Sequence, residues 1–167
     1  VYQSLTLINK AVEDGSFYKN EEFLKAINNV KENNSKLHIW GLLSNGGVHS
    51  SNEHIYALLK LAKQEGLEKV YVHAFLDGRD VAPDSGVDFV KELADKIEEI
   101  GVGEIATISG RYYAMDRDKR FDRIELAFDA IVNHKGESFE CPVQYVKDSY
   151  AKETYDEFVI PGYNKNV

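Results

Sequence analysis

Asp77-Gly78-Arg79-Asp80 follows directly on the apolar run Val70-Tyr71-Val72-His73-Ala74-Phe75-Leu76. A short run rich in β-branched and aromatic residues, bounded by polar helical segments, is typical of a buried parallel strand. In parallel sheets, ligands bind outside the carboxyl ends of the strands. The stretch therefore predicts a strand that carries acids, a glycine and an arginine at its functional end.

The same pattern occurs on both sides of this strand. Two further strands are predicted at residues 37–43 and 105–108, and each is followed by a loop, at residues 44–50 and 109–119. Apolar residues at helical spacing follow every loop. We predict an α/β fold, a three-layer βαβ domain with a mainly parallel sheet flanked by helices. Right-handed crossovers then place the three exit loops at one edge of the sheet.

Helices are also expected towards both ends of the chain. The first ends at Gly15, and Asn20 caps a second over residues 21–33. Pro142 begins a short helix, and residues 158–160 are a predicted strand. The helix after the third loop has apolar residues at Ile124, Ala127, Phe128 and Ile131.

Composition limits the classes of function. A chain of 167 residues fits one domain, and its net charge of −8 argues against nucleic acid or an anionic membrane surface as a partner. The lone Cys141 excludes an internal disulfide and favours a reducing cytoplasm. The sequence contains no transmembrane run or signal peptide and no initiator methionine, so we expect a processed or excised piece. Arginines concentrated between Arg79 and Arg123 favour a small anionic ligand.

The first two loops contain candidate anion ligands. Paired glycines let backbone amides approach a phosphate, and His49 lies just before a helix start. A tight turn with a locally bonded histidine is the alternative. Arg79 can grip a carboxylate or phosphate with parallel hydrogen bonds, and Asp80 can move protons on a hydroxyl. An ordinary turn salt bridge fits as well, with Asp77 and Gly78 shaping the turn.

The third loop is too long for a minimal turn, which favours binding. Arg111 and Arg117 are its best anion ligands, with Asp116 and Asp118 holding them in place. A solvated charged turn is the alternative. Packing is the simpler explanation for the remaining histidines and for the tryptophan, namely His38, His54, His73, His134 and Trp40.

The three loops together resemble a known family. GLLSNGGVHS (41–50), HAFLDGRDVAP (73–83) and SGRYYAMDRDKRFDR (109–123) match the cofactor-independent phosphoglycerate mutases in order and spacing. The resemblance implies that residues 1–167 are a single partial domain, the substrate-binding phosphotransferase part of this isomerase of glycolysis and gluconeogenesis. Residues 1–18 are expected to be a connector helix.

The resemblance also implies roles. Positions that contact 2- or 3-phosphoglycerate in the family correspond to His49, Arg79, Asp80, Arg111 and Arg117, with Asp80 as the acid/base. The phosphoryl group passes through a serine that two Mn²⁺ ions activate, in a phosphatase-like domain with no counterpart here. We therefore expect no metal ligands in this chain, and a partner in that missing domain of the same polypeptide. The full-length protein is expected to be a cytoplasmic monomer.

Some family features differ or are missing. Asn45, Ser51 and Phe121 stand where the family usually has Asp, His and Trp, and a later Arg-x-x-Arg element and a lysine are missing. We therefore expect a truncated domain that is inactive alone. The competing hypothesis is a stand-alone phospho-ligand binding or interaction module on the same scaffold. An independent phosphatase or hydrolase fits least, because the sequence has no nucleophile elbow or paired metal motif.

Overall fold

A central sheet organises the fold in the computed structural model, which describes residues 2–167. Its five strands have the order β1-β2-β3-β5-β4. The first three are parallel, whereas β5 runs antiparallel to β3. The predicted mainly parallel sheet is therefore confirmed. The strands are β1 (Leu37–Leu43), β2 (Val70–Leu76), β3 (Glu104–Gly110), β4 (Glu137–Phe139) and β5 (Gly162–Asn164).

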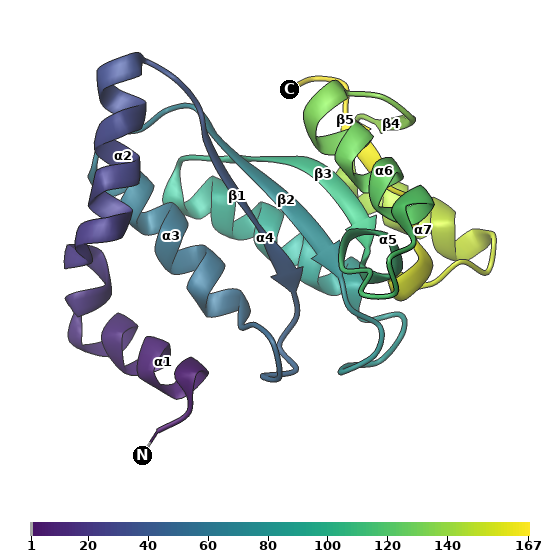
Figure 1. Cartoon of the computed structure of the whole chain (residues 1–167), viewed down its shortest axis with the longest axis horizontal. Coiled ribbons are helices and arrows are strands. Elements are labelled where there is room, and N and C mark those ends of the chain that lie inside the picture. Colours follow the sequence, from purple (N-terminus) through teal and green to yellow (C-terminus); the bar gives the residue numbers. More distant parts are fainter. Residues whose placement is uncertain (1) are drawn as a thin grey trace.

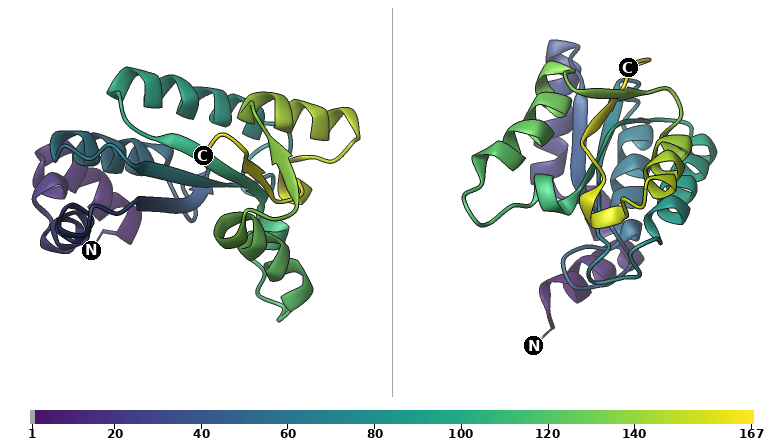
Figure 2. Two further views of the ribbon diagram at one scale, coloured as in Figure 1. Left: turned by 90° about the horizontal axis from the view of Figure 1, so that it is seen from above. Right: turned by 90° about the vertical axis from the view of Figure 1, so that its right-hand side faces the viewer.

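Helices cover both faces of this sheet (Figures 1 and 2). One face carries α3 (Asn52–Gln64), α4 (Gly86–Ile100) and α7 (Pro142–Ala151). The short α5 (Arg111–Ala114) and α6 (Phe121–Phe128) lie on the opposite face, over the β3 side. Near β1 lie α1 (Ser4–Asp14) and α2 (Glu21–Asn33). Short helical turns complete the chain at η1 (Ser16–Lys19), η2 (Asp129–Asn133) and η3 (Asp156–Phe158).

The core lies between the sheet and the helices α3 and α4. Alternate residues of β2 point towards these helices, and Val72 and Leu76 are almost fully buried there. Leu59 of α3 and Leu93 of α4 pack into the same cluster from the helical side. Because β1, β2 and β3 pair in parallel, their exit loops emerge at the same edge of the sheet.

The predicted end of the first helix and the predicted start and end of the second are confirmed. Gly15 ends α1 in the left-handed conformation, with φ of 83°. The Asn20 side chain accepts hydrogen bonds from the backbone N of Glu22 and Phe23, at 3.0 and 3.1 Å. Local capping chemistry therefore sets these boundaries, as the sequence indicates.

The prediction of a strand at residues 158–160 is wrong. A 3-10 turn forms at Asp156–Phe158, and the sheet instead continues at β5. The third strand is also longer than predicted and reaches Gly110, whose N–H donates to the carbonyl of Val159 at 2.8 Å. The loop expected at 109–119 consequently opens with the helical turn α5. Contacts between distant segments decide both differences.

Two apolar surfaces differ from the expected packing. Small residues, Ala127 and Ala130, are the buried ones of α6 and η2, whereas Phe128 is 53% exposed. Trp40 projects from β1 and is 69% exposed, which contradicts its predicted packing role. Periodicity identifies a helix or a strand, but it does not show which side the rest of the molecule covers. Among residues 2–167, no helix is long and apolar enough to cross a membrane.

Candidate anion-binding site

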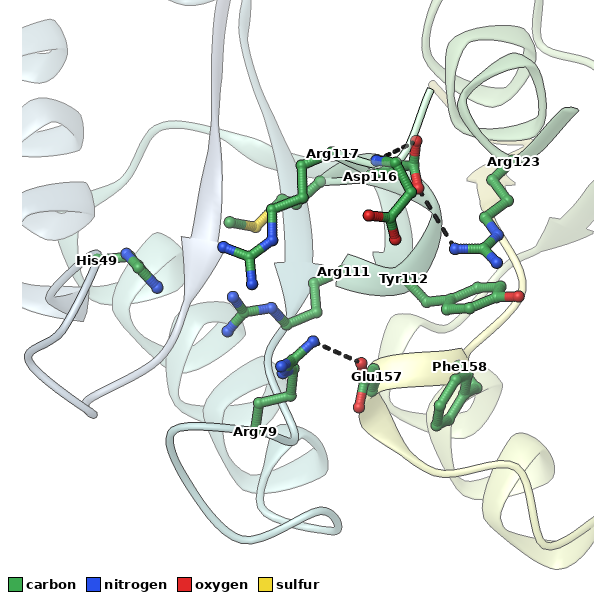
Figure 3. A pocket seen from close by; sticks show the side chains of 11 residues that line it. His49, Arg79, Arg111, Tyr112, Asp116, Arg117, Arg123, Glu157 and Phe158 are labelled. Atoms are coloured by element: carbon green, nitrogen blue, oxygen red, sulfur yellow. Dashed lines mark hydrogen bonds and ion pairs between the residues drawn. The ribbon is translucent and has the colours of Figure 1, made fainter. Parts of the chain in front are cut away.

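The three predicted exit loops meet at the edge where β1, β2 and β3 end. Together with η3 they enclose a cavity of about 420 Å³. Figure 3 shows His49, Arg79, Arg111 and Arg117 converging on this space from separate elements. The lining residues are His49, Arg79, Arg111, Tyr112, Met115, Asp116, Arg117, Asp118, Arg123, Glu157 and Phe158.

The buried carboxylate of Asp77 organises the first two loops. Its Oδ1 accepts from the backbone N of Arg79 and of Asp80, each at 3.1 Å, which builds the turn after β2. Its Oδ2 accepts from Ser44 Oγ at 2.6 Å, which ties the loop after β1 to the same point. Gly78 has φ of 61° in this turn. The turn-building role predicted for Asp77 and Gly78 is confirmed.

Arg111 is held firmly at the start of α5. Its Nη1 donates to Asp77 Oδ1 at 2.6 Å and to Asp80 Oδ2 at 2.9 Å. Burial opposes ionisation of Asp77, but hydrogen bonds from Ser44, the backbone and Arg111 outweigh it and hold the pKa of this carboxyl below its usual range. The same pairing, acting against burial, raises the pKa of Arg111. Arg111 is therefore a fixed, permanently charged residue in the lining of the cavity.

Asp80 contacts lining residues without lining the cavity itself. Besides its bond to Arg111, its Oδ2 lies 3.7 Å from His49 Nε2. The carboxylate thus lies between an arginine and a histidine that both face the cavity.

The third loop differs in detail from the expectation. Asp116 was expected to hold Arg111 or Arg117, yet its Oδ1 accepts from Arg123 Nη1 at 3.3 Å. Its Oδ2 accepts from the backbone N of Asp118 and Arg120, at 3.2 and 2.9 Å, so Asp116 shapes the loop itself. Within residues 2–167, Arg117 forms no side-chain hydrogen bond or ion pair. Its guanidinium is available to a ligand.

Some lining residues were not predicted. Glu157 comes from η3, 78 positions from Arg79, and its Oε1 lies 3.5 Å from Arg79 Nη1. The Arg123 guanidinium lies 3.9 Å from the centre of the Tyr112 ring, which also packs against Phe158. No local pattern marks Glu157 or Phe158, because their place depends on how a distant segment docks.

The histidines assigned to packing lie outside the cavity. His73 is buried in β2, where its Nδ1 lies 2.9 Å from Thr107 Oγ1 and its Nε2 lies 2.9 Å from His38 Nδ1. Burial, assisted by the neighbouring histidines, lowers the pKa of His73 to about 4. His73 is therefore neutral at physiological pH and links three strands of the sheet.

The balance of charges determines what the cavity can hold. Four arginines and His49 line it, against three carboxylates, and two of these carboxylates already contact an arginine. This arrangement suits a small ligand with more than one anionic group. In the part of the chain that the structure describes, no group of three or more His, Cys, Asp or Glu side chains is placed to hold a metal ion.

Comparison with known proteins gives consistent matches. The family model described as the BPG-independent PGAM N-terminus matches residues 8–166. 2,3-Bisphosphoglycerate-independent phosphoglycerate mutases from Clostridium perfringens strains SM101 and 13 are each 56% identical over 161 residues, which is 96% of this chain. The chain covers 31% of either relative, or about a third of its length. A Leishmania mexicana phosphoglycerate mutase structure, solved at low cobalt concentration, is 28% identical with a TM-score of 0.90, and the match covers 97% of this chain and 31% of that one.

Proposed function

Because the chain belongs to the family of BPG-independent phosphoglycerate mutase N-terminal regions, we propose that it is the substrate-binding part of such a mutase. The whole enzyme would interconvert 3-phosphoglycerate and 2-phosphoglycerate in glycolysis and gluconeogenesis. One observation carries this proposal: Arg79, Arg111 and Arg117 converge on one cavity with His49. A phosphoglycerate carries a phosphate and a carboxylate, which match the guanidinium groups of these arginines.

The residues have two roles in this proposal, namely substrate binding and proton transfer. Arg111 is fixed by Asp77 and Asp80 before a ligand arrives, so little ordering is needed on binding. Arg79 and Arg117 supply the other charged contacts, and His49 faces the cavity from the loop after β1. Asp80 acts as the acid/base on the substrate hydroxyls, from its position beside Arg111 and His49. The loops thus keep the glycerate in place while it reorients.

The phosphoryl transfer itself belongs to the rest of the polypeptide in this proposal. A serine and two Mn²⁺ ions there would supply the nucleophile and its activation, and this chain would be inactive alone. Residues 1–167 then form one partial domain with residues 1–18 as a connector. The absence of any buried residue in α1, among those described, supports a connector role. The partner is the remainder of the same chain, in a cytoplasmic monomer.

Calorimetric titration with 3-phosphoglycerate tests the binding role. We expect weak binding that both Arg79→Ala and Arg111→Ala diminish, each by about 1.5–3 kcal/mol, because each removes a charge-assisted contact to the ligand. Arg120→Ala is the matched control, since Arg120 pairs with Asp122 on the surface and does not line the cavity.

The arginine variants also separate the two hypotheses. Unchanged affinity in both Arg79→Ala and Arg111→Ala would show that 3-phosphoglycerate binds elsewhere or nonspecifically. Binding of inorganic phosphate without any preference for 3-phosphoglycerate would favour the stand-alone phospho-ligand module instead.

A further inference from the structure

The fold brings the acidic side chain of Glu157, from a distant segment, into a cavity whose arginines suit an anionic ligand. The backbone of Glu157 lies against Gly78 and Gly110, the glycines that follow β2 and end β3. A Cβ on Gly110 would lie 2.2 Å from the carbonyl oxygen of Glu157, and one on Gly78 would lie 2.9 Å from its backbone N. Two glycines thus leave room for this segment, so the position of Glu157 is built into the site.

The neighbouring residue anchors the segment. Asp156 is fully buried, accepts from the backbone N of Gly86 at 2.7 Å and from the Tyr150 hydroxyl, and donates its own N–H to the carbonyl of Pro83. These contacts hold η3 through its backbone and through Asp156. Within residues 2–167, the only hydrogen-bond or ion-pair partner of the Glu157 carboxylate is Arg79. The fold therefore does not depend on the charge of Glu157.

The pair between Glu157 and Arg79 is loose compared with the other pairs of the site. The two groups are 3.5 Å apart, and the Arg79 side chain is 53% exposed. Arg111, by contrast, lies 2.6 Å from Asp77 and is only 13% exposed. Arg111 has a permanent partner, whereas an incoming anion can replace the partner of Arg79.

We propose that Glu157 is an internal counter-ion that competes with the anionic ligand for Arg79. Without ligand it holds the Arg79 guanidinium at the cavity; Figure 3 shows the contact between the two side chains. On binding, a carboxylate or phosphate oxygen takes over Arg79, and Glu157 is left beside it as a charge that favours release. This inference rests on the proposed function for the identity of the ligand. Glu157 is thus a positioning residue that sets affinity.

Substitution of Glu157 by Gln tests the competition directly. Glutamine keeps an acceptor oxygen for Arg79 but removes the charge. We expect Glu157→Gln to bind 3-phosphoglycerate and inorganic phosphate about two- to five-fold more tightly at low salt, the range of an exposed ion pair. The gain should shrink as salt screens the charges, and the thermal midpoint should stay unchanged. Glu98→Gln, near the far end of α4, is the control for net charge.

A double variant separates competition from general repulsion. If Glu157 acts through Arg79, the gain from Glu157→Gln should largely disappear in the Arg79→Ala background. An equal gain in both backgrounds, or unchanged or weaker binding in Glu157→Gln alone, would overturn the inference. Failure of the wild-type chain to bind 3-phosphoglycerate would contradict the proposed function, and the inorganic phosphate titration would then still decide the role of Glu157. Binding of neither anion would overturn both.

Discussion

At the scale of single residues, one carboxylate determines much of the site. The Asp77 carboxylate accepts hydrogen bonds from a serine hydroxyl, two backbone N–H groups and the Arg111 guanidinium. Its contacts to Arg79 and Asp80 are local, and an acid followed by glycine predicts them. Its contacts to Ser44 and Arg111 span more than thirty positions, and no sequence pattern specifies them. Residue types were therefore predictable from the loops, whereas most of their pairing was not.

A second buried carboxylate, Asp156, gives a prediction about pH. Burial raises the pKa of Asp156 to about 6, although hydrogen bonds from Tyr150 and Gly86 oppose the shift. Between its unfolded value near 3.8 and this value, the folded protein retains a proton that the unfolded chain has released. The contribution of Asp156 therefore favours folding at acid pH and is lost as pH rises through about 6.

Asp156→Asn removes this proton exchange. We expect the free energy of unfolding of the variant, relative to wild type, to increase by about 2–3 kcal/mol between pH 4 and pH 7. Urea unfolding of both proteins across this range measures the difference, and other titrating groups cancel in the comparison. A difference that does not vary with pH would contradict the raised pKa of Asp156.

At the scale of elements, the docking of η3 against β3 completes the cavity. Gly110→Ala should lower the free energy of unfolding by about 1–3 kcal/mol, because the new methyl group meets backbone atoms of Glu157 and Val159 that must shift. It should also weaken 3-phosphoglycerate binding, because a shift of η3 would disturb the packing of Phe158 on Tyr112 in the cavity lining. Urea unfolding and calorimetry measure the two effects.

Gly41 provides the matched control for this substitution. It also lies in a strand, β1, but a Cβ there would have no neighbour within 4 Å. Gly41→Ala should leave stability unchanged or raise it by about 0.5–1 kcal/mol. Equal effects of the two alanines would contradict the close docking of η3 on β3.

Elements were predictable where local patterns determine them. The three parallel strands, their exit loops and the capped α2 follow from periodicity and capping chemistry. The turn at Asp156–Phe158 does not, because its conformation depends on contacts with Gly78, Gly86 and Gly110. The exposed side of α6 was also not predictable, because helical spacing alone does not reveal what covers a face.

At the scale of the whole molecule, the site is assembled from segments that lie far apart along the chain. Its lining runs from His49 to Glu157 and Phe158, so the parallel core, the third loop and the C-terminal segment must all be in place. The curated relatives are about three times as long. We propose that this chain contributes the anion-binding residues, and that the rest of the polypeptide contributes the phosphoryl-transfer groups.

The most direct test of this division of roles is a chimera in which the chain forms part of a full-length mutase. This chain would replace the corresponding 161 residues of the Clostridium perfringens mutase, and 3-phosphoglycerate turnover would be measured in a coupled assay with manganese. We predict an active chimera, a loss of about 10- to 100-fold in kcat/KM on Arg111→Ala within it, and no turnover by this chain alone. A folded but inactive chimera, or turnover by the isolated chain above a blank, would contradict the account.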